Sequence, residues 1–550
     1  MTASNLRIPT CRRRTTIFAL IVVMVVGATL RLWALGASSL WMDEALSWRL
    51  QSFPVMQLIS RTAEPATCHP PFYFLLLKGW TTAWGDSDVV LRLLSCLVGV
   101  LLIPVMYAWG SELCQWVPPQ LNGSDRAPLV GLAAAAIVAC NPLQVHLSQQ
   151  VRGYSLASLL AAASGCILLK ALRASRLESA LWLGWAATAV LLCYTHNLGP
   201  VTVAAEVLFA VRVCWLQFVA MSPNADGVAP SLRSSPLGSR RFLMPLLAAM
   251  LVAIAYVPWL THAAAQADTL GGSFRNDLTL ETVQATFYGA FIEGSDTPGT
   301  SSILRIGAIL LVAVLHLTVW LKGGTAGLFL LLWSLVPVYL LLFFSLISSR
   351  SIFLTRYLFV AQLGWILMAA LVPFLFRKAH FQALAVAMMI TLVTAHATVT
   401  IAQLNRPRPP GMRGAADYLR EHVKPGESIL ALSPQIFLTA KPYLPGDGEL
   451  RLLSMTCDRT THSGSPLLLD TDLVLPEWPR ESGDRSFWLI RSQSYRVLAK
   501  EDWETLETAT IRSFRRIGVT EWPQENRWEQ PIVVEHYLQS STTGDHATID

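Results

Sequence analysis

The sequence predicts an α-helical polytopic membrane protein with about eleven spans and a small C-terminal α/β soluble domain. Of its 550 residues, 53% are apolar or aromatic and only 14% are charged, and the mean hydropathy is +0.45. Soluble domains carry about one quarter charged residues, so lipid replaces water as the solvent for most of this chain. The apolar residues also gather into runs near 20 residues long, the length that crosses a bilayer.

Charge divides the chain near residue 403. Residues 403–550 contain 17 of the 42 Lys and Arg and 21 of the 36 Asp and Glu. The preceding residues therefore have a net charge of +10 and the rest −4. We expect a membrane catalytic domain over 1–402 and an α/β domain over 403–550, with a disordered tail at 540–550. Within the second domain, the pattern predicts one helix and two strands, at 412–421, 428–432 and 487–490.

The apolar runs predict the positions of the spans. They lie at 17–35, 88–109, 128–142, 154–172, 179–194, 198–217, 241–260, 303–321, 325–347, 355–376 and 380–402. The first run is too long for the apolar core of a signal peptide, so we interpret it as a retained span.

The short segment Pro70–Trp84 decides the orientation. If it lies in the outer interface rather than crossing, eleven cationic residues beyond position 100 fall inside and five outside, as the positive-inside tendency favours. The N-terminus is then cytoplasmic and the C-terminal domain extracytoplasmic. The turns and loops that carry most of the unusual polar residues all face outward.

Asp43 and Glu44 follow the first span within an apolar, aromatic segment. Two adjacent carboxylates near lipid carry a cost in free energy, which favours a functional role for them. A carboxylate in this position can act as a general base. The alternative is that an acid caps an interfacial helix. Both readings stay open.

Several other polar residues on the outer face are candidate binding residues. His69 precedes two prolines that can start a helix, and it could contact a substrate or only cap that helix. Four arginines lie at outward helix ends, where snorkelling or anion binding could explain them. They are Arg92, Arg152, Arg350 and Arg356, of which Arg152 and Arg356 are close in sequence to Tyr154 and Tyr357.

Weaker signals complete the set. His196 lies in an outward turn, with structural and functional readings equally open. For Glu206, inside a span, pairing with a neighbouring helix is favoured over function. Glu293 and Asp296 belong to the loop 261–302, whose Gly-rich composition suits a mobile lid. We interpret cysteines within apolar runs as packing residues.

Six strings, taken in order, resemble the protein O-mannosyltransferase-like branch of the GT-C glycosyltransferases, glycosyltransferase family 39 and its bacterial relatives. They are SLWMDEALSW, HPPFYFLLLKGW, LRLLSCLVG, NPLQVHLSQQVRGYSL, YTHN and FLTRYL. The resemblance covers the membrane domain and not the tail. It implies an outward active site, a polyprenyl- or dolichyl-phosphate sugar donor, and a role for Asp43 in activating the acceptor, with Glu44 as the adjacent acid.

The resemblance also implies that Gln149 and Gln150 belong with Arg152 and Tyr154 among the substrate-binding residues. Relatives often carry Glu where this chain has Gln150, and a neutral amide cannot act as a base. Asp43 is therefore the better candidate for proton transfer. The short loop 261–302 lacks the large insertion of the eukaryotic enzymes, which favours a bacterial inner-membrane protein.

The predicted function is transfer of a monosaccharide from a polyprenyl-phosphate donor to an extracytoplasmic hydroxyl, with inversion. The acceptor could be a protein, a lipid or a glycan, and nothing indicates nucleic-acid binding. No cofactor is required, although Asp43 and Glu44 could ligate a divalent cation. The alternatives are a lipid-linked sugar flippase, and a glycan ligase or polymerase that uses a lipid-diphosphate donor.

Overall fold

The computed structural model describes residues 10–67, 69–121, 125–174, 179–220, 236–273, 278–294, 301–347, 351–444, 450–453, 465–474, 485–492, 514–524 and 530–539. Contacts divide the chain into two compact units. The first comprises Met1–Leu35, Cys68–Gly85 and Val89–Arg406, and the second comprises Gly36–Thr67, Asp86–Asp88 and Pro407–Asp550.

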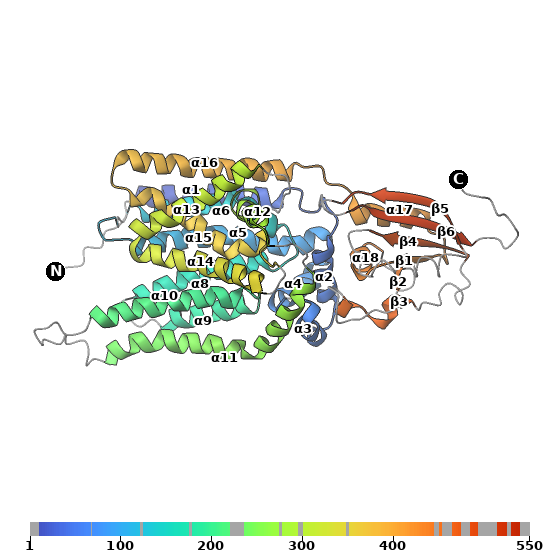
Figure 1. Cartoon of the computed structure of the whole chain (residues 1–550), viewed down its shortest axis with the longest axis horizontal. Helices are drawn as coiled ribbons and strands as arrows, with labels where there is room; N and C mark the ends of the chain where they lie inside the picture. Colours follow the sequence, from blue (N-terminus) through green and yellow to red (C-terminus); the bar gives the residue numbers. More distant parts are fainter. Residues whose placement is uncertain are drawn as a thin grey trace, which may run out of the picture. The chain divides into compact units, whose positions relative to one another are not determined.

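Apolar helices form the first unit, and its longest helices run side by side (Figure 1). They are α1 (Thr10–Leu32), α4 (Phe72–Trp84), α5 (Asp88–Leu113), α6 (Ala127–Cys140), α7 (Pro142–Ser148), α8 (Tyr154–Arg173), α9 (Ser179–Cys193), α10 (Gly199–Ala220), α11 (Pro236–Ser273), α12 (Leu280–Tyr288), α13 (Ser302–Lys322), α14 (Gly324–Ile347), α15 (Phe359–Leu371) and α16 (Ala379–Leu404). Short helical turns are η2 (Cys114–Trp116), η3 (Gly289–Glu293), η4 (Thr355–Leu358) and η5 (Val372–Leu375).

Each predicted span coincides with a helix, which confirms the polytopic fold class. Within the described residues, nine helices are long and apolar enough to cross a membrane, or ten if one bent pair is counted as a span. Helix α9, with 15 residues, is shorter than a full span. Helix α15 is buried along its whole length and forms the centre of this unit.

The bent pair consists of α6 and α7, which meet at an angle of 60°. Pro142 has no amide hydrogen to continue α6, and the Asn141 side chain caps α7 by accepting from the Gln144 amide at 3.0 Å. The buried Arg31 guanidinium donates to the main-chain oxygens of Val138 and Ala139, at 3.1 and 2.9 Å. The break leads the chain directly into the turn that carries Arg152.

The predicted lid over 261–302 is helical where it is described. Helix α11 continues to Ser273, and α12 is followed by the π-helical turn η3. Three side chains from α15 and α16 satisfy carbonyl groups of that turn: Gln362 donates to Ala290, His396 contacts Phe291 at 2.7 Å, and Gln403 donates to Glu293. These bonds hold η3 in place, so the described part is not the glycine-rich loop that its composition suggested.

The second unit contains a sheet of mixed direction with helices packed on it (Figure 1). Its elements are α2 (Met42–Ser52), α3 (Val55–Ala63), η1 (Pro65–Thr67), α17 (Gly411–His422), β1 (Ser428–Ala431), α18 (Pro434–Ala440), β2 (Leu450–Leu453), η6 (Ser465–Leu467), η7 (Asp470–Asp472), β3 (Leu473–Val474), β4 (Ser486–Arg491), β5 (Phe514–Trp522) and β6 (Ile532–Gln539). The strand order is β3-β2-β1-β4-β6-β5. Strands β3, β2, β1 and β4 are parallel, whereas β6 and β5 pair antiparallel.

Helices α2 and α3 belong to this unit, although the sequence placed them in the membrane domain. The Arg49 guanidinium of α2 forms an ion pair of 2.7 Å with Asp472 and donates to the Leu467 main-chain oxygen at 3.2 Å. Helix α18 also packs on α2. Composition separates lipid-facing from water-facing segments, but it does not identify which distant segments pack together. The polar tail 540–550 lies outside the described residues.

Candidate functional site

The two adjacent acids occupy the first turn of α2, in the second unit. Glu44 is 1% exposed, and its carboxylate accepts the Trp41 amide at 3.3 Å. It therefore caps the helix, which is one of the two roles considered for this pair. Asp43 is partly exposed, and its main-chain oxygen accepts the Ser47 hydroxyl at 3.1 Å. Of the two carboxylates, that of Asp43 is the more accessible to a substrate.

In the first unit, four chain turns bring imidazole, guanidinium and aromatic groups together. His69 precedes α4, and Arg152 lies in the turn between α7 and α8. His196 lies between α9 and α10, and Arg356 belongs to η4 before α15. A small pocket forms where three of these turns meet. It is lined by His69, Tyr73, Phe74, Arg152, Gly153, Tyr154, Thr195 and His196.

The rings around His196 pack closely. Its centroid lies 5.4 Å from that of His69 and 5.3 Å from that of Tyr154. Phe359, at the start of α15, approaches to 5.2 Å, and Tyr357 to 6.0 Å. The Arg356 guanidinium lies over the Tyr357 ring, 5.6 Å from its centroid. These contacts pack the His196 ring against aromatic and imidazole rings from three other segments.

Hydrogen bonds tie the turns to one another. The Tyr73 and Ser95 hydroxyls are 2.9 Å apart, and Ser95 donates to the Arg152 main-chain oxygen at 3.3 Å. The Phe72 amide donates to the Tyr194 oxygen at 3.0 Å, which joins the start of α4 to the end of α9. The pocket is thus built on helix ends rather than on a long loop.

Its electrostatics are dominated by cations. None of the eight described residues that line it is acidic. Burial, and then the charges of Arg152 and Arg356, lower the pKa of His196 to about 3. Burial, followed by Arg152, His196 and Arg356, also holds the pKa of His69 well below its usual value. Both imidazoles are therefore neutral at physiological pH, and the arginines supply the positive charge.

The tautomer of His196 follows from its partner. The Leu198 amide donates to Nδ1 at 3.1 Å, so Nδ1 carries no hydrogen and Nε2 carries it. His196 is 3% exposed, and Nε2 has no hydrogen-bond partner among the described residues. An unsatisfied buried donor is costly. An oxygen atom that accepts a hydrogen bond from Nε2 would satisfy this donor.

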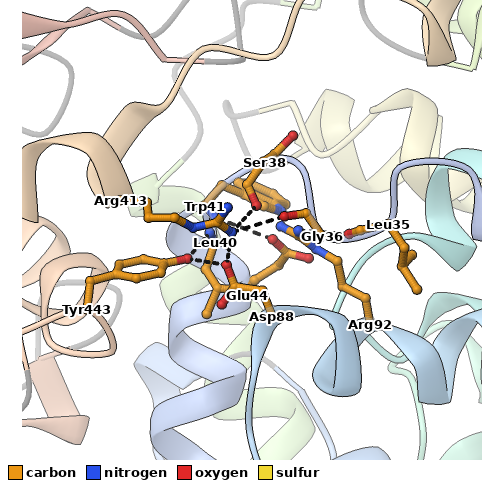
Figure 2. Close-up of polar contacts among 10 residues, drawn as sticks. All are labelled: Leu35, Gly36, Ser38, Leu40, Trp41, Glu44, Asp88, Arg92, Arg413 and Tyr443. Atoms are coloured by element: carbon orange, nitrogen blue, oxygen red, sulfur yellow. Dashed lines mark hydrogen bonds and ion pairs between the residues drawn. The ribbon is translucent and has the colours of Figure 1, made fainter. Parts of the chain in front are cut away.

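Three of the predicted binding residues have structural partners instead. Arg92 is 5% exposed and donates to the Leu35 main-chain oxygen at 3.1 Å (Figure 2). The Gln149 amide donates to the oxygens of Arg31 and Trp33, each at 3.0 Å, at the end of α1. Gln150 contacts His146 at 2.8 Å. None of the three is among the pocket-lining residues.

Glu206 pairs with neighbouring helices, the reading that the sequence favoured. One carboxylate oxygen accepts from the Ser164 hydroxyl at 2.7 Å and from the Trp185 indole at 2.6 Å. Glu293 lies in η3, whereas Asp296 and Arg350 are outside the described residues. The described cysteines are unpaired and largely buried, which fits their interpretation as packing residues.

Sequence reasoning missed Tyr73, Phe74, Gly153 and Thr195 as pocket residues. Each is close in sequence to a predicted residue: Tyr73 and Phe74 come shortly after His69, Gly153 follows Arg152, and Thr195 precedes His196. The sequence feature that could have identified them is a His close to aromatic or hydroxyl residues near the end of a helix. Over the described ranges, no group of three or more His, Cys, Asp or Glu is placed to hold a metal ion.

Comparison with known proteins supports the fold. No protein-family model and no curated protein matches the sequence. ArnT from Cupriavidus metallidurans in the apo state is 14% identical, with a TM-score of 0.55 over 96% of this chain and 98% of that one. ArnT bound to undecaprenyl phosphate gives 12% identity and a TM-score of 0.51, over 96% and 98% of the two chains.

A third solved structure agrees with these two. The apo Archaeoglobus fulgidus oligosaccharyltransferase is 11% identical, with a TM-score of 0.52 over 94% of this chain and 75% of that one. At such low identity the similarity establishes the fold alone. The chain therefore has the GT-C fold, as the six sequence strings predicted.

Proposed function

We propose that this protein is a glycosyltransferase that moves a monosaccharide from a polyprenyl-phosphate carrier to an acceptor hydroxyl, with inversion. The observation that carries the proposal is the cationic pocket, which is lined by Arg152 and by an imidazole with an unsatisfied N–H, and in which the charges of Arg152 and Arg356 both act on that imidazole. Guanidinium and N–H donors in a dry site suit a phosphate oxygen. The ArnT structure bound to undecaprenyl phosphate supports the class of donor.

In the proposed reaction, Asp43 accepts the proton of the acceptor hydroxyl as its oxygen attacks the anomeric carbon. The bond from that carbon to the phosphate oxygen breaks, and the electron pair leaves with the polyprenyl phosphate. Arg152 and Arg356 stabilise the charge that develops on this leaving group, and His196 Nε2 donates to one of its oxygens. A single displacement of this kind inverts the anomeric centre.

We further propose that the acid pair, the cationic pocket and the C-terminal domain face the extracytoplasmic side of a bacterial inner membrane. The distribution of Lys and Arg between the loops supports this orientation. An alkaline phosphatase fused after Asp550 should be active in intact cells, whereas a fusion after Lys322 should not. The reverse pattern would contradict the orientation.

Membranes of a host strain that lacks this gene provide the natural donor and acceptor, whichever sugar is involved. We expect the polyprenyl-phosphate sugar to accumulate there, where lipid mass spectrometry measures it. Adding the purified full-length protein should consume it, and Asp43→Asn should slow that consumption at least 100-fold. Asp417→Asn, on the exposed side of α17, is the matched control and should behave as the unmodified protein.

Binding of the leaving group is tested separately with undecaprenyl phosphate. Arg152→Gln should weaken its binding about tenfold or more, while the exposed Arg212→Gln should not. Near-normal turnover of a well-expressed Asp43→Asn would remove Asp43 from the mechanism. Accumulation of a lipid-diphosphate sugar would favour the ligase, and translocation of the carrier without sugar transfer would favour the flippase.

A further inference from the structure

The loop 36–41, which precedes α2 in the second unit, is held by side chains that follow it by hundreds of residues. The Leu40 amide donates to the Tyr443 hydroxyl at 2.6 Å. The same hydroxyl donates to the Asp88 carboxylate at 2.7 Å. Figure 2 shows Tyr443 and Arg413 directed at Asp88 and at the main chain of this loop.

Arg413, from α17, holds the earlier part of the loop. Its Nη2 lies 3.1 Å from the main-chain oxygens of both Gly36 and Ser38, and it forms an ion pair with Asp88. The carboxylate of Asp88 therefore orients both the guanidinium and the phenol that bind the loop. Two side chains, oriented by Asp88, thus satisfy three main-chain groups within five consecutive residues.

These groups are shielded from water. Leu40 is 1% exposed, Ser38 6% and Tyr443 8%. Burial, and then the Asp88 charge, raise the pKa of Tyr443, so the phenol keeps its proton and can donate. Because a buried amide without a partner is costly, the loop has a strong preference for the position in which Leu40 meets Tyr443.

The next amide along the chain belongs to the helix. The Trp41 amide donates to Glu44, and Asp43 lies between these two residues. Consecutive amides are therefore fixed, one by the C-terminal domain and one by the first turn of α2. A close approach adds to this: a Cβ on Gly411, which has a φ of +53°, would lie 2.6 Å from the Ser39 hydroxyl.

We infer that Tyr443, Asp88 and Arg413 are positioning residues, which set the place of Asp43 by fixing the loop that enters α2. The inference rests on the proposed function of Asp43. It gives the C-terminal domain a part in catalysis without contact with the reacting atoms. Because catalytic geometry is sensitive to displacements near 1 Å, loss of one such bond is expected to slow turnover more than it affects binding.

The test uses the full-length protein and membranes of the deletion strain as the source of donor and acceptor. We expect Tyr443→Phe to lower the rate of donor consumption between 10- and 100-fold. Binding of undecaprenyl phosphate should stay within about twofold of the unmodified protein, because the pocket is unchanged. Tyr418→Phe, another tyrosine of the same domain, is the matched control and should leave both quantities unchanged.

A double-mutant cycle separates positioning from general loss of structure. If Tyr443 acts through Asp43, adding Tyr443→Phe to the Asp43→Asn variant should lower the rate of donor consumption less than threefold. If the role of Tyr443 is purely structural, Tyr443→Phe should lower the rate by the same factor in the unmodified protein and in Asp43→Asn. That result would overturn the inference. Arg413→Lys, which keeps the charge but loses the fork of donors, provides a second variant and should show the same pattern if Tyr443→Phe folds poorly.

The outcomes also separate this inference from the proposed function. If Asp43→Asn is inactive while Tyr443→Phe and Arg413→Lys turn over normally, the positioning role is wrong and the proposed function stands. If Asp43→Asn itself turns over normally, Asp43 has no part in the mechanism and the positioning role fails with it, whereas the proposed function fails only if the unmodified protein consumes no donor.

Discussion

Nδ1 of His196 accepts a hydrogen bond from the Leu198 amide at 3.1 Å. This single contact places the ring hydrogen on Nε2, which has no hydrogen-bond partner among the described residues, and His196 lines the pocket. His196→Phe should therefore weaken the binding of undecaprenyl phosphate by about 10- to 100-fold, the value of a hydrogen bond to a charged group. Titration of the purified protein with this lipid measures the effect.

The matched variant is His196→Gln, whose side-chain amide places a donor near the position of Nε2. It should retain affinity within about threefold, whereas His196→Asn, with its shorter side chain, should not. Equal loss in the Phe and Gln variants would show that ring packing, and not the donor, controls binding.

The lowered pKa values of His196 and His69 also predict how stability depends on pH. Each pKa is lower in the folded protein than in the unfolded chain, so the unfolded chain binds more protons as the pH falls below about 6.5. Stability is therefore greatest above that pH and is lost towards pH 3. Between pH 7.5 and 5.5, His196 alone should account for about 1.4 kcal/mol of lost stability.

Thermal denaturation in detergent at these two pH values measures this loss. His196→Gln should lose less stability on acidification than the unmodified protein, by about that amount. A variant with the same pH dependence as the unmodified protein would show that His196 does not titrate on unfolding.

The ion pair between Arg49 and Asp472 should contribute to the stability of the second unit. Their side chains are 10% and 6% exposed, so Asp472→Ala leaves a buried guanidinium without its counter-charge. We expect a loss of about 3 kcal/mol. The control is the pair Arg420–Asp417, whose side chains are 51% and 52% exposed, where Asp417→Ala should cost less than about 1 kcal/mol. Resistance to proteolysis would report both changes, and equal effects would contradict this difference.

Substitution of Glu206 by Gln should preserve the stability of the protein, whereas substitution by Ala should lower it. Glu206→Gln keeps an oxygen for the Ser164 hydroxyl and the Trp185 indole. Glu206→Ala leaves both donors unsatisfied within the helices and should lower stability by about 2 kcal/mol or more. The melting temperatures of the two variants give the comparison. Loss of donor consumption in a stable Glu206→Gln variant would instead indicate a catalytic role.

The helices of the membrane unit were predicted well from the sequence, because nearly every residue of a membrane span is apolar and the signal therefore extends over the whole span. Helix α9 shows the limit of this signal, since an apolar run identifies a helix but not whether it crosses the bilayer. The tail was predicted in outline: α17, β1 and β4 coincide with the expected helix and strands. Their common sheet depends on pairings between distant segments, which local patterns do not contain.

The pocket was predicted only in part. Arg152 and Arg356 approach the same imidazoles, as their outward positions allowed. Arg92 has the same sequence signature but turns to the end of α1. The direction of a long side chain depends on which nearby carbonyl groups lack a hydrogen-bond partner. For Arg92 these groups lie after the end of α1, and composition does not show where that helix ends.

The pairing of α2 with the C-terminal domain has a consequence for synthesis of the chain. Arg49 and Asp472 are separated by 423 residues. At roughly 5 to 20 residues per second, α2 leaves the ribosome about 20 to 80 seconds before its partner. During that interval its future interface is incomplete, while the intervening spans are inserted one after another. A segment made much later therefore completes the surroundings of α2.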